Sequence, residues 1–179
     1  MGVSLAAALW GFAEATLFFI VPDVLLSFVA LRRRRAALIA CLFATAGALV
    51  GGALMFAWGS SDVAGAVAAL DRVPAVSVEM VEQVESDLER QGLWALMVGP
   101  FRGTPYKIYA VESAELEVSL GLFLAVSIPA RLIRFVLLSL IASWLSERLL
   151  GSWSLGRKRW AMGCFWVLFY TVFLLWMPS

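Results

Sequence analysis

The sequence has 179 residues, of which 62% are hydrophobic and 15% charged, and its mean hydropathy is +0.88. Soluble domains carry roughly 45–50% apolar and about 25% charged residues, so this composition indicates an integral membrane protein. The net charge is only +1, and the absence of histidine excludes enzymes and metal sites that depend on imidazole.

Residues 1–31 are apolar but too long for one crossing, and Glu14, Pro22 and Asp23 interrupt them. No basic residue precedes the apolar stretch, and Ala6 stands where N-myristoylation requires Ser or Thr, so we expect neither a cleaved signal peptide nor a lipid anchor. Broken helices at membrane depth occur only where protein or a wet cavity surrounds them. This stretch therefore predicts a first re-entrant helical hairpin.

Residues 36–58 contain no charged side chain and are long enough to cross a hydrocarbon core of about 30 Å, so they predict a transmembrane helix. Gly47 and Gly51, with Gly52 next to them, form a face of small residues that allows another helix to approach closely. We expect this face to pack helices. It is also the candidate contact for a homodimer, which the small number of spans favours.

The segment 59–92 is polar enough to leave the bilayer, and seven acids but only two bases lie between Asp62 and Arg90. Apolar residues recur at helical spacing among these acids, which predicts an amphipathic helix on the outer surface with a solvated acidic face. The apolar residues are Val78, Val81, Val84 and Leu88.

Residues 93–111 predict a second re-entrant hairpin, because Gly99-Pro100, Arg102-Gly103 and Pro105 break a short apolar run. Three acids follow at its mouth and are predicted to form a solvated rim, with Glu112 as a candidate to compensate the charge of Lys107. They are Glu112, Glu115 and Glu117.

Two further stretches, residues 118–146 and 160–178, predict transmembrane helices. The first carries Arg131 and Arg134, whose spacing of three places them on one helix face. The second is expected to be scaffold, with aromatic anchors near its ends. These aromatic residues are Trp160, Trp166, Tyr170 and Trp176.

Basic residues cluster at 32–35 and 157–159, and short basic loops mark the cytoplasmic side of a membrane protein. The acidic segment then lies outside, and the two hairpins enter from opposite sides, as in the inverted repeats of secondary transporters. The predicted fold class is an all-α integral membrane protein with two opposed re-entrant hairpins, about three transmembrane helices and an inverted repeat. Its membrane domain covers residues 1–150, and the C-terminal helix follows.

Six ionisable residues lie at predicted membrane depth: Glu14, Asp23, Arg102, Lys107, Arg131 and Arg134. A charge at the bilayer centre costs about 2.5–3.5 kcal/mol, so these residues must face one another or water. Two acids against four bases leave two positive charges, which suits binding of a phosphate or carboxylate. The alternative is that the charges form structural ion pairs between the hairpins and the helices.

Several motifs occur together between residues 10 and 145. In the first half they are Phe12-Ala13-Glu14-Ala15, Pro22-Asp23-Val24-Leu25-Leu26, Arg32-Arg33, Gly47-x3-Gly51-Gly52 and Trp58-Gly59. In the second half they are Gly99-Pro100-Phe101-Arg102, Thr104-Pro105-Tyr106-Lys107-Ile108 and Arg131-x2-Arg134-Phe135. The first set resembles the DedA superfamily, also called the VTT or SNARE-associated Golgi protein family, and the second set is similar to its YqaA-like branch.

The resemblance implies two opposed re-entrant hairpins and movement of lipids across a bilayer. Bacterial members are implicated in recycling undecaprenyl phosphate or translocating phosphatidylethanolamine, with dependence on the proton motive force, and eukaryotic relatives are lipid scramblases. The implied location is the cytoplasmic (inner) membrane of a bacterium. By position, Glu14 and Asp23 are the proton-coupling acids. The implied headgroup-binding bases are Arg102, Lys107, Arg131 and Arg134, and the implied hairpin and packing residues are Pro22, Pro105, Gly47 and Gly51.

We therefore expect a flippase-like or scramblase-like lipid translocase for a phosphate-bearing lipid such as undecaprenyl phosphate or a phospholipid, with Glu14 and Asp23 exchanging protons. Two alternatives stay open: a proton-coupled transporter of a small anionic solute, and a non-transporting membrane scaffold. A laterally open groove would favour a lipid, and an enclosed cavity would favour a solute.

The sequence predicts no enzyme, because Asp23 has no second membrane aspartate for an aspartyl protease and nucleophilic serine or cysteine would have no histidine partner. Cys41 and Cys164 lie in apolar runs, where a thiol behaves as a small hydrophobe. We expect no metal, no other cofactor and no nucleic acid; the expected partners are membrane lipids, protons and a second copy of the chain.

Overall fold

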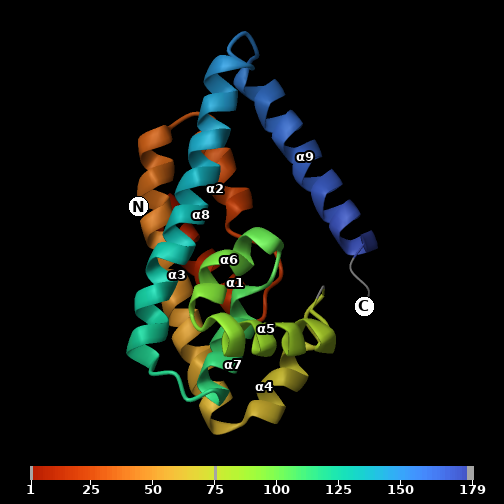
Figure 1. The fold of residues 1–179 in the computed structure, drawn as a ribbon. Coiled ribbons are helices and arrows are strands. Elements are labelled where there is room, and N and C mark those ends of the chain that lie inside the picture. Colours follow the sequence, from red (N-terminus) through yellow and green to blue (C-terminus); the bar gives the residue numbers. More distant parts are fainter. Residues whose placement is uncertain (1, 75, 177–179) are drawn as a thin grey trace.

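The computed structural model describes residues 2–74 and 76–176, and within those ranges nine helices and no strand are present (Figure 1). The helices are α1 (Gly2–Ala15), α2 (Asp23–Ala30), α3 (Arg34–Ser61), α4 (Val63–Leu70), α5 (Val78–Gln91), α6 (Trp94–Arg102), α7 (Tyr106–Glu115), α8 (Leu120–Arg148) and α9 (Leu155–Trp176).

Three of the described helices, α3, α8 and α9, are long and apolar enough to cross a membrane. They contain 28, 29 and 22 residues, which at about 1.5 Å per residue gives lengths of roughly 33 to 44 Å, more than a hydrocarbon core of about 30 Å. The prediction of an all-helical membrane protein with about three spanning helices is confirmed at this level.

The third spanning helix begins earlier than its apolar pattern predicted. α9 starts at Leu155, so Arg157, Lys158 and Arg159 belong to its first turn and not to a loop. The backbone N–H of Arg157 donates a hydrogen bond to Ser154 Oγ at 3.4 Å. A serine in this position satisfies a free N–H at a helix start, which explains why the helix extends through the basic residues.

Small residues allow α1 and α3 to pack in close backbone contact. A Cβ atom on Gly47 would lie 1.9 Å from the carbonyl oxygen of Ala8, and one on Gly11 would lie 2.1 Å from that of Ala44. Gly51 faces α1 in the same way, at Phe12. The predicted helix-packing role of these glycines is thus fulfilled inside one chain. The suggestion that Gly47 and Gly51 contact a second copy is wrong, because α1 already covers them.

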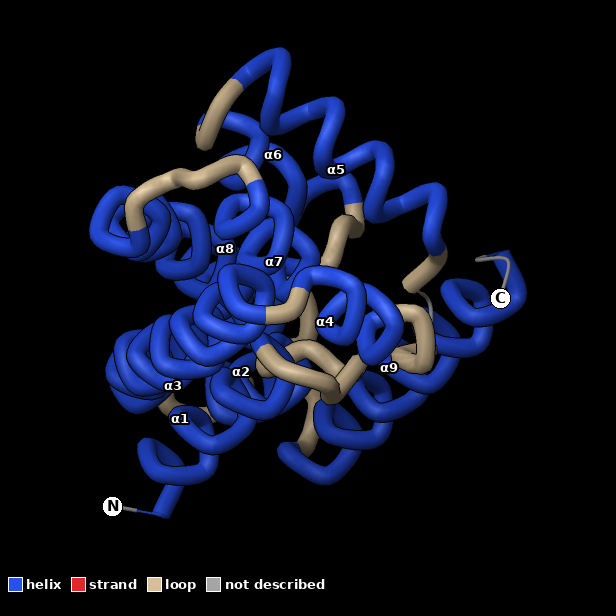
Figure 2. Tube along the Cα trace, turned by 90° about the horizontal axis from the view of Figure 1, so that it is seen from below, coloured by secondary structure: helices blue, strands red, loops and turns tan. Residues whose placement is uncertain are grey.

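The short helix α7 lies in the centre of the molecule, and Figure 2 shows α3, α4, α5, α6 and α8 around it. Its residues 106–114 are all buried. Against α3, Tyr106 lies beside Gly52 and Val111 lies beside Gly59. α7 therefore runs alongside the second half of α3, toward the end at which α3 stops.

The acidic segment folds onto the protein rather than standing apart from it. Val81, Val84 and Leu88 of α5 are buried in the same apolar cluster as α7, whereas Val78 is exposed, contrary to the helical pattern in which it was included. The acids of α5 remain mostly at the surface, as predicted. α4 was not predicted as a separate helix; Asp62 starts it by accepting a hydrogen bond from Gly65 N at 2.9 Å.

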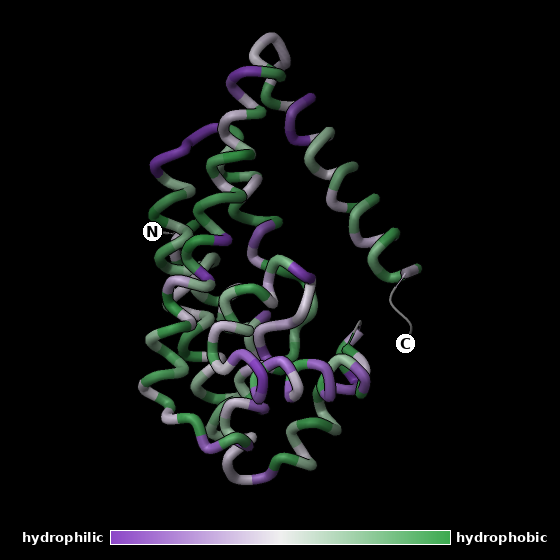
Figure 3. Tube along the Cα trace, viewed as in Figure 1, coloured by the Kyte–Doolittle hydropathy of each residue, from purple (hydrophilic) through white to green (hydrophobic). Residues whose placement is uncertain are grey.

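Hydrophilic segments gather at the two ends of the long helices (Figure 3). The basic connection between α2 and α3 and the first turn of α9 lie toward one end, and α5 lies toward the other. Basic and acidic residues are therefore separated along the direction in which α3 and α8 run.

Candidate functional site

Two breaks between helices face each other in the middle of the molecule. The first, residues 16–22, follows α1, where the Thr16 hydroxyl donates hydrogen bonds to the carbonyl oxygens of Phe12 and Ala13. Pro22 then precedes α2, because proline has no N–H to donate and suits a helix start.

The second break lies between α6 and α7. Gly103 adopts φ +88°, a left-handed conformation that favours glycine and ends α6. Pro105 then precedes α7, in the same position as Pro22 before α2. Lys107 Nζ donates a hydrogen bond to the carbonyl oxygen of Phe18 at 2.7 Å, so the two breaks are joined directly.

Two ion pairs connect the first break to α8. Arg131 binds Glu14 with both guanidinium Nη atoms, and the Nη1 to Oε1 distance is 3.4 Å. Arg134 Nη2 lies 2.6 Å from Asp23 Oδ2. Glu14, Asp23 and Arg131 are buried, while the side chain of Arg134 is 21% exposed. The spacing of three on α8 therefore directs two arginines to two acids that lie on either side of the helix break.

Aromatic rings and a hydroxyl pair fix Arg131 in place. Its guanidinium carbon lies 4.8 Å from the ring centres of both Tyr106 and Phe135, distances at which cation–π attraction operates. Tyr106 in turn donates a hydrogen bond to Ser127 Oγ at 2.9 Å. Arg131 is thus held between α7 and α8, with Glu14 as its counter-ion.

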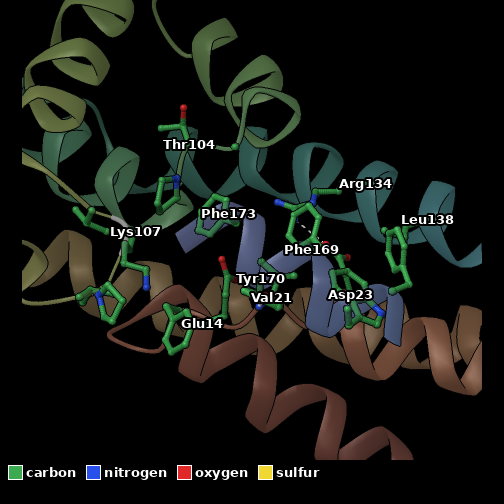
Figure 4. A pocket seen from close by; sticks show the side chains of 18 residues that line it. Glu14, Val21, Asp23, Thr104, Lys107, Arg134, Leu138, Phe169, Tyr170 and Phe173 are labelled. Atoms are coloured by element: carbon green, nitrogen blue, oxygen red, sulfur yellow. Dashed lines mark hydrogen bonds and ion pairs between the residues drawn. The ribbon is translucent and has the colours of Figure 1, made fainter. Parts of the chain in front are cut away.

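A cavity of about 220 Å³ lies between the two breaks, α8 and α9 (Figure 4). Glu14, Asp23, Lys107 and Arg134 contribute its charged wall. Asp23 Oδ1 is buried there and has no hydrogen-bond partner among the described residues. The cavity therefore offers two cationic groups and one free acceptor oxygen to anything that enters it.

Aromatic side chains of α9 form the opposite wall, although this helix was expected to be scaffold. Phe165, Trp166, Phe169, Tyr170 and Phe173 all line the cavity. Their spacing of three to four residues places them on one helix face, and this pattern was visible in the sequence.

Two of these aromatic residues were predicted as membrane-surface anchors, and that interpretation is wrong for both. Trp166 is only 7% exposed and donates a hydrogen bond to Ser27 Oγ at 2.9 Å. The hydroxyl oxygen of Tyr170 accepts a hydrogen bond from Val21 N at 2.9 Å. Both side chains face α2 and the first break, and they attach an otherwise exposed α9 to the rest of the protein.

A second, almost entirely apolar cavity of about 270 Å³ lies between α8 and α9. Leu138, Phe165 and Trp166 line both cavities, so the two are adjacent. Lys158 lies in the lining of the second cavity, and its Nζ donates to the carbonyl oxygen of Ser146 at 2.7 Å. The charged cavity and the apolar cavity are therefore neighbours.

The six charged residues predicted at membrane depth do not all lie at the cavity. Glu14, Asp23, Lys107 and Arg134 line the charged cavity, whereas Arg131 is not part of the lining and is paired with Glu14. Arg102 does not join them: its side chain is 61% exposed and lies 3.8 Å from Asp87 of α5. Since Arg102 ends α6 before the Gly103 turn, it faces away, and the predicted excess of two positive charges falls to one.

The predicted acidic rim is wrong for Glu112. Glu115 and Glu117 are exposed as expected, but Glu112 is buried on α7. It does not pair with Lys107, which bonds to Phe18 instead. Five residues separate the two on one helix, and this spacing does not bring side chains together.

No family model and no curated protein matches the sequence, and no solved structure matches the fold.

Proposed function

We propose that this protein is a lipid translocase, flippase-like or scramblase-like, that moves a phosphate-bearing lipid such as undecaprenyl phosphate or a phospholipid across a bacterial cytoplasmic membrane. In this proposal α1–α2 and α6–α7 are the two re-entrant hairpins of a DedA-like (VTT-like) inverted repeat. Their meeting at the bond between Lys107 and Phe18 supports it, because such hairpins of transporters meet around a binding site.

One observation favours a lipid over a soluble anion as the substrate. The charged cavity lies next to the apolar cavity between α8 and α9, and three residues line both. An amphipathic ligand needs both environments at once: cationic groups for its phosphate and an apolar surface for its hydrocarbon chain. A soluble anion would use only the charged half.

The charged residues suggest how a headgroup is held and released. Arg134 is the partly exposed cation, and it is paired with Asp23, whose second oxygen is free. A proton bound by Asp23 would remove the charge that holds Arg134 and leave its guanidinium for a phosphate. Loss of that proton would restore the ion pair and release the headgroup. Glu14, which lines the cavity, holds Arg131 in the same way, and Arg131 itself is not part of the lining.

The test is transbilayer movement of lipid in liposomes that contain the purified protein, measured for undecaprenyl phosphate and for phosphatidylethanolamine. Arg134→Gln removes the cation that faces the cavity and is expected to lower the rate at least tenfold. Arg102→Gln is the matched control, because it removes an arginine that lies outside the cavity beside Asp87, and it should transport at the wild-type rate.

Three outcomes would contradict the proposal. They are movement of neither lipid faster than in protein-free vesicles, transport by Arg134→Gln at the rate of Arg102→Gln, and uptake of a soluble phosphate ester while neither lipid moves. The last outcome would identify a small anionic solute as the substrate.

A further inference from the structure

Glu112 is a buried acid that forms no ion pair with any residue the structure describes. It is 1% exposed on α7, a helix whose residues 106–114 are all buried. Glu112 Oε1 has no hydrogen-bond partner among the described residues, and the same holds for the hydroxyl of its neighbour Ser113. Buried polar groups are normally hydrogen-bonded, so two adjacent exceptions require an explanation.

The position of Glu112 is between the acidic end of the molecule and the charged cavity. The preceding residue, Val111, contacts Gly59 near the end of α3. At the other end of α7, Lys107 lines the cavity, five residues before Glu112, or about 7.5 Å along the helix axis. One short helix therefore carries both the unpartnered acid and a cation of the site.

The charged groups that act on Glu112 are acidic. They are Glu85 on α5, which packs against α7, and Glu115 on α7 itself. Glu14 and Asp23, by contrast, each have an arginine partner. Burial, Glu115 and Glu85 together raise the pKa of Glu112 from its ordinary value of 4.5 to about 7.

We propose that Glu112 is a proton-binding site that loads from the acidic end of the protein and couples proton uptake to movement of lipid at the charged cavity. The coupling half of this inference rests on the proposed function, whereas the proton site itself does not. The buried residues of α7 carry two charges, those of Lys107 and Glu112. Protonation of Glu112 removes one of them, so the two protonation states place different charges beside the cavity. The proton comes from water and returns to water, and no covalent bond of the protein changes.

Stability measured against pH tests the proton site without any transport assay. An acid whose pKa is higher in the folded than in the unfolded state binds its proton more tightly when folded, so it favours folding at low pH. This contribution is complete below about pH 4.5 and is lost as the pH rises through about 7. We expect the wild-type melting temperature in detergent to fall across that window.

Glu112→Gln should remove the part of this dependence that Glu112 contributes, and it should melt at a higher temperature than the wild type at pH 8. Glu117→Gln is the matched control, because Glu117 is an exposed acid two residues past the end of α7 and is not among the charges that act on Glu112, and it should follow the wild-type profile. If Glu112→Gln shows the same fall in melting temperature as the wild type, the proton site is refuted.

Transport measured with and without a pH gradient tests the coupling. With the acidic end of the protein facing the lower pH, the wild type should move lipid several times faster than at symmetric pH. For Glu112→Gln the ratio of the two rates should fall to one, and for Glu117→Gln it should equal that of the wild type. A wild-type ratio in Glu112→Gln overturns the coupling.

The two hypotheses can fail separately. A pH-dependent melting temperature that disappears in Glu112→Gln supports the proton site even if no lipid moves, and in that case the proposed function fails. The opposite result is also possible to recognise. If lipid movement depends on Arg134 but the melting temperature of Glu112→Gln varies with pH as that of the wild type does, the function is supported and the proton site is refuted.

Discussion

The charged residues at the centre of this protein form ion pairs, and the pair of Arg131 and Glu14 is more deeply buried than that of Arg134 and Asp23. Neither side chain is more than 5% exposed. Taking two charges out of water costs free energy that their attraction recovers only in good geometry, here with two contacts between guanidinium and carboxylate and two aromatic rings around the arginine. The pair therefore specifies one arrangement of α1, α7 and α8.

Removal of one member should be far more harmful than removal of both. Arg131→Met leaves the Glu14 carboxylate buried without its cation, and we expect a loss of about 3–5 kcal/mol in the free energy of unfolding. The double variant Glu14→Gln with Arg131→Met leaves no unpaired charge and should lose less than Arg131→Met alone. Chemical denaturation in detergent measures both. Equal losses in the single and double variants would contradict this expectation, because they would show that leaving Glu14 without its cation has no cost.

Sequence spacing could predict part of this site but not its pairing. Arg131 and Arg134 share a face because they are three residues apart, and the acids at 14 and 23 were visible as charges in an apolar stretch. The partners lie 117 and 111 residues apart, so only the packed structure shows which acid meets which arginine. Arg102 was misplaced because nothing local shows that the turn at Gly103 directs it outward.

Among the elements, the contact between α1 and α3 depends on the absence of side chains. Gly47 and Gly11 bring the two backbones together at positions where a Cβ atom would overlap a carbonyl oxygen. Backbone cannot move aside as the end of a flexible side chain can, so any larger residue separates the helices. Small residues at a fixed spacing permit this kind of close helix packing in membranes.

Gly47→Ala should therefore destabilise the protein by about 1–3 kcal/mol, even though alanine favours helices. Gly121→Ala is the matched control on α8, because nothing lies within 4 Å of its added Cβ. It should be neutral, or stabilising by no more than about 1 kcal/mol. Thermal unfolding of both variants in detergent gives the comparison, and equal behaviour of the two would contradict the close packing of α1 on α3.

The boundaries and faces of the helices show which structural features the sequence pattern can predict and which it cannot. The spans at 36–58 and 118–146 were found because apolar runs of that length are typical of transmembrane helices, even though the second run carries Arg131 and Arg134. The start of α9 was missed because the apolar run begins only after the basic residues 157–159. The helix begins before them, where Ser154 accepts a hydrogen bond from the backbone N–H of Arg157. The inward face of α9 was missed because Trp166 and Tyr170 fit two patterns, a membrane-surface anchor and a packed helix face, and only their partners decide between them.

At the scale of the whole molecule, charge is separated along the long helices. The connection before α3 and the first turn of α9 are basic, and the segment from Asp62 to Arg90 is acidic. Membrane proteins keep Lys-rich and Arg-rich short loops on the cytoplasmic side, so the basic end should lie inside and the acidic end outside. The buried acid Glu112 then lies in the outward half, where it would take up protons from the exterior.

This orientation can be tested with single cysteines and a reagent that cannot cross the membrane. In a background with Cys164→Ala, where Cys41 is buried and protected, Glu82→Cys places a thiol on the exposed face of α5 and Arg33→Cys places one in the basic connection before α3. Intact spheroplasts should label the cysteine at position 82 and not the one at position 33, and both should react once the membrane is opened with detergent. The reverse pattern would place the acidic segment inside. Glu112 would then face the cytoplasm, and an acidic exterior could not load it.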